Sequence, residues 1–177
     1  MNSFKNLKID GSWTLFLDRD GVINKRLIDN YVKNIDEFEF LPGVQEAIAK
    51  FSKFFGRIFV VTNQRGISRG FMSAEDLRLV NNFMLKNIEE SGGRIDKIYF
   101  CPHDRDENCG CRKPAPGMAF NAKEEFPEVD FSKSIMIGDS VSDIGFGKNA
   151  GMITVQITSE EVEGLRAESL FDFASRI

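Results

Sequence analysis

Two aspartates lie directly after an apolar run near the start of the chain. In the stretch LFLDRDGVIN, Asp18 ends the run and Asp20 follows two residues later, just before Gly21. Carboxylates at this spacing repel each other, and a hard divalent cation such as Mg²⁺ removes the repulsion while it binds a phosphate oxygen. One carboxylate beside such a metal can attack phosphorus, and a second can act as general acid and then as base. The pair therefore indicates phosphoryl transfer, although a single D-x-D is more often a solvated turn.

Three later segments carry side chains suited to the same chemistry. VVTNQRG offers the Thr62 hydroxyl, the Asn63 amide and loop N–H groups to phosphate oxygens. CRKPAPGM supplies Lys113, a compact cation that can neutralise charge on a transferring group, and IGDSVSD supplies Asp139 and Asp143. Each segment also has an ordinary interpretation, as a polar turn, a solvated lysine or a helix cap. Their joint presence favours one shared site.

All three cysteines and the only histidine lie within the eleven residues CPHDRDENCGC. Cys101, His103, Cys109 and Cys111 have the composition of a closed Cys₃His zinc site, which usually holds a structural ion. The loop between them is polar and has little core of its own, so we expect zinc to fold it. A Cys109–Cys111 redox pair and free thiols are the alternatives.

Short apolar runs alternate along the chain with amphipathic helical patterns. We expect strands at 13–18, 57–63, 97–101, 134–139 and 152–157. We expect helices from the PGV segment with Pro42 in the first turn, from Ser73 with Asp76 in a capping box, near Pro116 and near Ser142, and a peripheral helix after 158.

Continuous apolar strands are typical of a parallel sheet that is covered on both faces. The alternating order predicts a doubly wound α/β fold with a five-stranded, mainly parallel sheet, helices on both faces and a single domain over residues 1–177. Ligands bind outside the carboxyl ends of the strands in such sheets. Asp18, Thr62 and Asp139 should therefore converge in one crevice.

Charge and hydropathy exclude several classes of partner. The formal net charge of the 177 residues is −4, which argues against a broad nucleic-acid surface. The longest aliphatic runs are far too short to span a bilayer, and the N-terminus lacks the apolar region of a secretory signal. We expect a cytoplasmic protein that binds a small metabolite, with no nucleic-acid or membrane partner.

In chain order, the segments DRDGVIN, VVTNQRG, CRKPAPGM and IGDSVSDIGFGKNAG resemble the four motifs of the haloacid dehalogenase superfamily of phosphatases. The resemblance implies a Rossmann-like fold and an Mg²⁺-dependent phosphomonoester hydrolase that forms an aspartyl-phosphate. The implied roles are Asp18 as nucleophile, Asp20 as general acid/base, both with Asp139 as Mg²⁺ ligands, Thr62 and Asn63 in phosphate binding, Lys113 in stabilising the phosphoryl group, and Asp143 in a supporting position.

The cysteine-rich loop narrows the resemblance to a branch that carries such a zinc loop and has no large cap domain. This branch contains the D-glycero-D-manno-heptose 1,7-bisphosphate phosphatases and the histidinol-phosphate phosphatases. TNQRGISRG and RKPAPGM are more similar to the heptose enzymes, which cleave the 7-phosphate, whereas the short spacing from His103 to Cys109 also occurs among the histidinol enzymes. A non-catalytic phosphate- or metal-binding module is the alternative of another class, which the presence of both Asp18 and Asp20 disfavours.

Two basic pairs lie in loops near the expected crevice. They are Arg65 with Arg69, and Arg112 with Lys113. Because a sugar bisphosphate has a second phosphate and arginine binds phosphate through paired hydrogen bonds, we expect Arg65 and Arg112 to bind substrate. Solvated arginines are the alternative for the first pair. The zinc loop directly precedes the second pair, so an ordered loop should place both of its cations.

Overall fold

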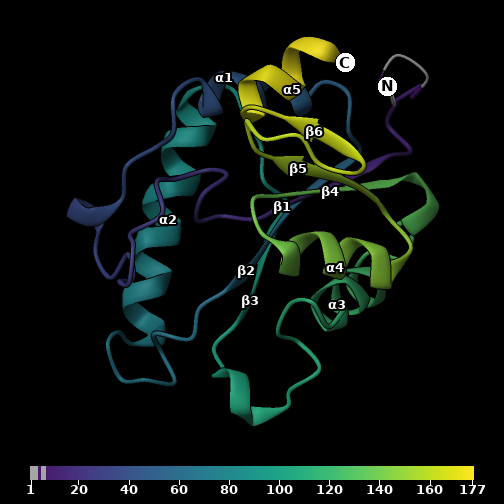
Figure 1. Cartoon of the computed structure of the whole chain (residues 1–177). Helices are drawn as coiled ribbons and strands as arrows, with labels where there is room; N and C mark the ends of the chain where they lie inside the picture. Colours follow the sequence, from purple (N-terminus) through teal and green to yellow (C-terminus); the bar gives the residue numbers. More distant parts are fainter. Residues whose placement is uncertain (1–3, 5–6) are drawn as a thin grey trace.

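A computed structural model describes residue 4 and residues 7–177. Its strands form one parallel sheet in the order β3-β2-β1-β4-β5-β6 (Figure 1). The strands are β1 (Thr14–Leu17), β2 (Arg57–Asn63), β3 (Lys97–Cys101), β4 (Ser134–Gly138), β5 (Ile153–Ile157) and β6 (Leu165–Ala167). The helices are α1 (Val44–Phe51), α2 (Ala74–Glu90), α3 (Gly117–Glu125), α4 (Val141–Ala150) and α5 (Leu170–Arg176), with short 3₁₀ turns η2 (Ile35–Glu37), η3 (Arg105–Glu107) and η4 (Phe131–Lys133).

The doubly wound α/β prediction is confirmed, and the five predicted strands agree with the structure to within one residue at each end. The predicted strand count was one too low. β6 pairs with β5, with Val155 opposite Leu165, in the segment where only a peripheral helix was expected. Its three residues, LRA, are too few to show the periodicity of a strand. The single-domain assignment stays a prediction.

The helix starts follow local capping chemistry. Ser73 and Asp76 form the predicted capping box at the start of α2. α4 begins with Ser140 as its N-cap and ends at Gly151, whose φ of 83° suits glycine. Gly43 is the N-cap of α1, so Pro42 lies before the helix and not in its first turn as predicted.

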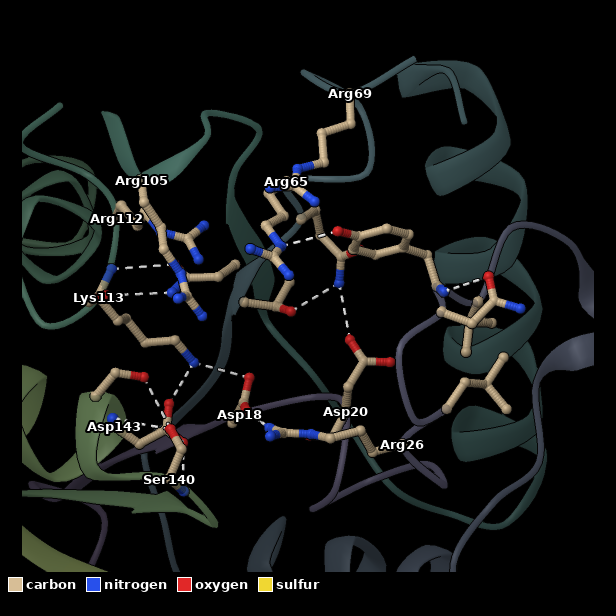
Figure 2. Close-up of a pocket in the computed structure, with 18 of the residues that line it drawn as sticks. Asp18, Asp20, Arg26, Arg65, Arg69, Arg105, Arg112, Lys113, Ser140 and Asp143 are labelled. Atoms are coloured by element: carbon tan, nitrogen blue, oxygen red, sulfur yellow. Dashed lines mark hydrogen bonds and ion pairs between the residues drawn. The ribbon is translucent and has the colours of Figure 1, made fainter. Parts of the chain in front are cut away.

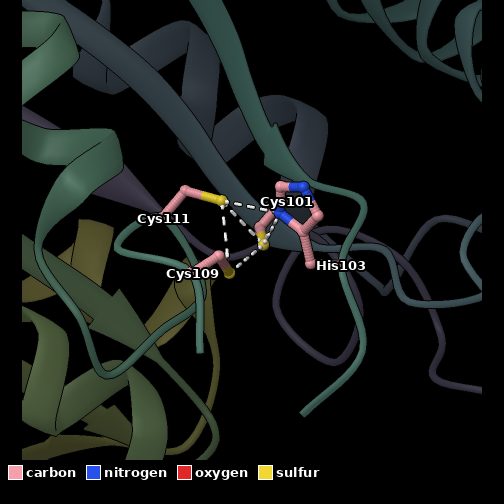
Figure 3. A group of neighbouring side chains, drawn as sticks. All are labelled: Cys101, His103, Cys109 and Cys111. Carbon is pink, nitrogen blue, oxygen red and sulfur yellow. Dashed lines mark hydrogen bonds between the residues drawn. The ribbon is translucent and has the colours of Figure 1, made fainter. Parts of the chain in front are cut away.

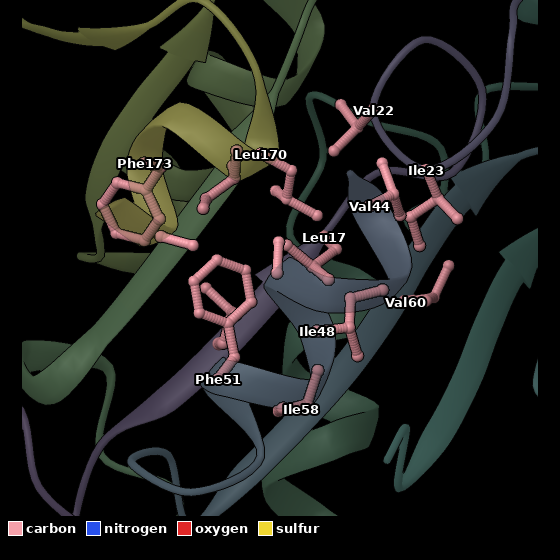
Figure 4. Close-up of a cluster of buried hydrophobic side chains, with 14 of the residues drawn as sticks. Leu17, Val22, Ile23, Val44, Ile48, Phe51, Ile58, Val60, Leu170 and Phe173 are labelled. Carbon is pink, nitrogen blue, oxygen red and sulfur yellow. The ribbon is translucent and has the colours of Figure 1, made fainter. Parts of the chain in front are cut away.

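Hydrophobic side chains from alternate strand positions fill the two faces of the sheet. Leu15 and Leu17 of β1 belong to a core that α1, α2 and α5 cover. Figure 4 shows Leu17 among side chains of α1 and α5. Phe16, between them, points to the opposite face, where α3 and α4 pack. Both faces are therefore buried, as the continuous apolar strands predicted.

The strand order places the ends of three strands around one crevice. β1 pairs with β2 on one side and with β4 on the other, so the direction of winding reverses between β1 and β4. Asp18 follows β1, Asp139 follows β4 and Thr62 lies near the end of β2.

The segment 18–43 between β1 and α1 holds only η2 and two isolated bridges, which agrees with the absence of a large cap. Among the described residues, no helix is both long and apolar enough to cross a membrane.

The C-terminal helix α5 is held to α1 by aromatic packing. The Phe173 ring is fully buried, with its centroid 5.7 Å from that of Phe51 and 5.0 Å from that of Phe4. Phe171, two residues earlier on the same helix, is about half exposed.

We predict that Phe173→Ala lowers the free energy of unfolding by about 3–5 kcal/mol, because it leaves a cavity between two helices. Phe171→Ala is the matched control and should cost less than about 1 kcal/mol. Urea titration followed by circular dichroism measures both. Equal losses would show that α5 is not held by this contact.

Candidate active site

A cavity of about 580 Å³ lies at the carboxyl ends of β1 and β2 (Figure 2). Asp18, Asp20 and Asp143 line it, together with Thr62 and Asn63. Six cationic side chains also line it: Arg26, Arg65, Arg69, Arg105, Arg112 and Lys113. A cavity rich in arginine within a chain of net charge −4 suits a multiply anionic ligand.

The Lys113 ammonium lies between two buried carboxylates, as Figure 2 shows. Its Nζ is 2.8 Å from Asp18 Oδ1 and 2.6 Å from Asp143 Oδ1, and it donates to the Val61 carbonyl at 2.7 Å. Burial raises the pKa of Asp18 to about 7; Lys113 opposes the rise and Asp143 adds to it. Burial works against the ammonium, but the two carboxylates outweigh it and raise the pKa of Lys113 above its usual value. Lys113 is thus a charged group in contact with the predicted nucleophile.

Asp143 divides its two oxygens between this ion pair and a helix cap. Oδ1 faces Lys113, and Oδ2 accepts hydrogen bonds from the Ser140 N–H at 3.0 Å and the Ser140 hydroxyl at 2.6 Å. The start of α4 therefore fixes the lysine. Ser140 was not predicted as part of the site, because a serine at a helix start is common for capping alone.

Asn63 and Thr62 are engaged by other protein groups. Asn63 Oδ1 accepts from the Lys113 N–H at 3.0 Å, and Asn63 Nδ2 donates to the Lys113 carbonyl at 3.2 Å. The buried Thr62 hydroxyl accepts from Gln64 Nε2 at 2.9 Å. Asn63 thereby holds the backbone of the catalytic lysine candidate, while phosphate binding by either residue stays a prediction.

Hydrogen-bond donors surround the Asp20 carboxylate. Oδ1 accepts from Arg19 Nη2 and Asn24 Nδ2, both at 3.0 Å. Oδ2 accepts from Arg19 Nε at 3.2 Å and from Gln64 Nε2 at 2.9 Å. Burial would raise the pKa of Asp20, but the charge of Arg19 and these hydrogen bonds outweigh it and lower that pKa. Because every one of these partners is a donor, together they favour the ionised carboxylate, the form in which Asp20 can accept a proton.

The Asp20 carboxylate lies apart from a cluster of three other carboxylates that could hold a metal ion. Carboxylate oxygens of Asp18, Asp139 and Asp143 lie within 4.8 Å of one another, whereas that of Asp20 faces its own donors. The main-chain oxygen of Asp20 points the other way and accepts from Arg26 Nη2 at 3.0 Å. The oxygen that Asp20 directs toward Arg26 and the neighbouring carboxylates is thus its main-chain carbonyl, and Asp20 as a metal ligand stays a prediction.

One cationic nitrogen lies among oxygens of all three predicted metal ligands. Arg26 Nη2 is 2.7 Å from Asp139 Oδ1 and 3.7 Å from Asp18 Oδ2, in addition to its contact with the Asp20 carbonyl. Burial raises the pKa of Asp139, and Arg26 opposes the rise. Sequence analysis missed Arg26, because nothing in NKRL separates it from a surface arginine.

The arginines near the cavity differ in the protein groups that they already contact. Arg112 Nη1 donates to the His103 carbonyl at 3.2 Å, and Arg65 Nε donates to the Tyr31 hydroxyl at 2.8 Å. Arg69 forms an ion pair with Asp104 at 2.7 Å. Since a guanidinium has five N–H donors, Arg65 and Arg112 keep donors for a ligand in the cavity that they line. Arg69 is already neutralised.

Cys101, His103, Cys109 and Cys111 converge at the base of the loop between β3 and α3, as Figure 3 shows. Their ligand atoms all lie within 4.8 Å of one another, and five contacts between them range from 2.9 to 3.6 Å. A tetrahedral zinc ion with bonds of about 2.0–2.3 Å needs neighbouring ligand atoms roughly 3.3–3.8 Å apart. None of the three cysteines is in a disulfide. The two contacts of the histidine nitrogen, 3.3 and 3.6 Å, lie within this range, while the sulfur atoms are somewhat closer together, so the four side chains are gathered as candidate ligands of one metal ion.

Comparison with known proteins agrees with this geometry. A family model described as HAD-hydrolase-like matches residues 110–170. A Mycobacterium bovis D-glycero-alpha-D-manno-heptose-1,7-bisphosphate 7-phosphatase is 37% identical over 170 residues, covering 92% of this chain and 90% of the relative. A Campylobacter jejuni enzyme of the same name is 44% identical over 147 residues, covering 83% of each chain.

A solved structure shares the architecture. The D,D-heptose 1,7-bisphosphate phosphatase of B. bronchiseptica, determined in complex with magnesium and phosphate, superposes with a TM-score of 0.84 at 30% identity. The match covers 92% of this chain and 96% of that one. The extent of these similarities and the cluster of Asp18, Lys113 and Asp143 lead to one assignment: the chain belongs to the heptose-1,7-bisphosphate phosphatase family of HAD-like hydrolases.

Proposed function

We propose that this protein hydrolyses the 7-phosphate of D-glycero-D-manno-heptose 1,7-bisphosphate through an aspartyl-phosphate intermediate. The observation that carries the proposal is the buried Asp18 carboxylate, which is in contact with the Lys113 ammonium at an arginine-lined cavity. A non-catalytic phosphate-binding module would need the arginines but not a buried carboxylate facing the anion. Relatives named for heptose bisphosphate favour this sugar over histidinol phosphate.

The chain's own groups account for both halves of the reaction. An Asp18 oxygen attacks phosphorus, the bond from phosphorus to the sugar oxygen breaks, and Asp20 gives its proton to the leaving alkoxide. Lys113 neutralises negative charge on the transferring group. Asp20 then removes a proton from the water that attacks the phosphoenzyme, which releases phosphate and restores Asp18.

The residues around Arg26 Nη2 fit a magnesium ion. Two carboxylates and a main-chain carbonyl surround this nitrogen, and oxygen is the ligand atom that Mg²⁺ prefers. Asp18, Asp139 and the carbonyl of Asp20 would hold the ion. When bound, Mg²⁺ supplies charge neutralisation at a phosphate oxygen, and Arg26, whose side chain is 49% exposed, has room to leave.

The cysteine cluster fits a structural zinc ion that sets the position of the second cationic pair. Arg112 follows Cys111 directly and is bound through its side chain to the His103 carbonyl. Zinc bound by four protein ligands would hold the backbone on both sides of that contact. Because Lys113 is the next residue, the same loop helps to place it.

Arg112 is our candidate for holding the phosphate that is not cleaved. Lys113 is needed at the reacting group, and Arg69 is paired with Asp104. Arg112 lines the cavity with donors to spare and with a backbone next to the metal cluster. Arg65, with one donor on Tyr31, is a second contact for the same ligand.

We predict that Arg26→Ala tightens Mg²⁺ binding, because it removes a cation that competes for the same oxygens. Exposed ion pairs are worth about 0.2–1 kcal/mol each, so the loss of two contacts should lower the dissociation constant roughly 2- to 30-fold. Isothermal titration calorimetry with MgCl₂ measures this without substrate. Lys25→Ala removes the same charge one residue away, where the side chain pairs with Glu39, and is the control. Binding that is unchanged relative to this control would contradict the competition.

We predict one zinc ion per chain in protein purified without added metal, measured by inductively coupled plasma mass spectrometry. Cys109→Ser should reduce the zinc content, lower the melting temperature and weaken activity, because the loop no longer fixes Arg112. Asp106→Asn lies in the same loop with an exposed side chain and should change none of these. Metal-free protein with wild-type stability would refute the structural zinc site.

The substrate is tested by comparing the kcat/KM of Arg112→Ala and wild type on the heptose 1,7-bisphosphate, in both anomers, and on the 7-phosphate. A charge-assisted hydrogen bond is worth about 1.5–3 kcal/mol, so Arg112→Ala should lose roughly 10- to 150-fold more on the bisphosphate. Arg69→Ala is the control and should discriminate little. Equal losses on both sugars would remove Arg112 from this role. A higher wild-type kcat/KM on histidinol phosphate would overturn the sugar assignment.

A further inference from the structure

Arg19 is the largest fully buried side chain of the described residues. A buried guanidinium is strongly destabilising unless its donors are paired. Two of its nitrogens, Nε and Nη2, form a fork on the two oxygens of the adjacent Asp20. The third, Nη1, donates to Asn81 Oδ1 at 3.1 Å. Arg19 therefore connects the proposed acid/base to a residue 62 positions away.

Asn81 lies on the core-facing side of α2, among the buried residues Val80 and Met84. A polar side chain on this face is costly unless it is hydrogen-bonded, and its Oδ1 accepts from Arg19. No residue of α2 lines the cavity, and this hydrogen bond connects the helix, through Arg19, to Asp20 in the cavity wall. Asn82, the next residue, is exposed and offers a matched comparison.

We propose that Asn81 and Arg19 are positioning residues that orient the Asp20 carboxylate toward the leaving-group oxygen. The inference rests on the proposed function, in which Asp20 is the general acid/base. A fork that contacts both oxygens fixes the plane of the carboxylate as well as its place, which a lysine ammonium does not do. Asn81 in turn fixes the rotation of the guanidinium from outside the cavity.

Loss of this orientation should affect substrates differently, according to whether their leaving group needs a proton. When the bond from phosphorus to a sugar oxygen breaks, the alkoxide needs the proton of Asp20. Acetate leaves acetyl phosphate as a stable anion and needs no proton. The parameter kcat/KM reports steps through formation of the phosphoenzyme, so a misplaced acid lowers it for the sugar and spares acetyl phosphate.

The experiment measures kcat/KM of wild type, Asn81→Ala, Asn82→Ala and Arg19→Lys on the heptose bisphosphate and on acetyl phosphate, with Mg²⁺. Asn81→Ala and Arg19→Lys should lose on the order of 10- to 100-fold on the sugar and less than about 3-fold on acetyl phosphate. Asn82→Ala should match wild type on both. Circular dichroism and thermal melts establish whether the variants fold. If Arg19→Lys does not fold, the result for Asn81→Ala decides the test.

Equal losses on the two substrates in a folded Asn81→Ala protein would overturn the inference, because they indicate a structural defect. The same holds if Asn81→Ala keeps wild-type activity on the sugar. A wild-type enzyme that cleaves acetyl phosphate but not the heptose bisphosphate would instead contradict the proposed function, and the inference would fall with it.

Discussion

The Lys113 ammonium lies between the buried carboxylates of Asp18 and Asp143, and the cost of burying these three charges determines how the crevice is built. One ammonium does not balance two carboxylates, and Asp139 adds a third nearby. A further cation relieves this excess of negative charge, and in this structure the Arg26 guanidinium contacts both Asp18 and Asp139. The same excess of negative charge is what makes the site suitable for a divalent ion.

The elements around this group hold it from several directions. Asn63 at the end of β2 binds both backbone groups of Lys113, and Asp143 ties the ammonium to the start of α4. The loop between β3 and α3 holds the chain just before it, through the cysteine cluster and the contact from Arg112 to the His103 carbonyl. An ion that orders this loop would act on catalysis without touching substrate.

That loop also contacts the loop after β2. Asp104 pairs with Arg69, and Glu107 accepts from the Ser68 hydroxyl at 2.7 Å. The cavity is thus walled by segments that hold one another in place, which compensates for the absence of a large cap. Arg65 belongs to one of these segments and reaches Tyr31 on a third.

Sequence analysis predicted the parts of the site that depend on strand ends and composition. Asp18 and Asp139 come together because parallel neighbouring strands share one carboxyl edge, and the four zinc-type ligands were recognisable by their types and spacing. The contacts of Arg26 and the fork of Arg19 depend on side-chain rotamers and loop paths, which leave no periodic signal.

Two misses have more specific causes. Asn81 follows Val80 on the apolar face of α2, and a single polar residue on such a face is common. Its role could not be predicted because its partner, Arg19, is far away in the sequence. Which oxygen of Asp20 faces Arg26 was not predicted, because it depends on the turn after β1, which directs the carbonyl there and leaves no pattern in the sequence.

The central claim is that Asp18 is the nucleophile, and detection of its phosphorylated form tests it most directly. The Asp20→Asn variant lacks the base for the second half of the reaction, so acetyl phosphate and Mg²⁺ should leave it phosphorylated. After acid quench and proteolysis, mass spectrometry should find one phosphate on Asp18, and none in Asp18→Asn. Phosphate on another residue, or turnover by the Asp18→Asn protein, would contradict the account.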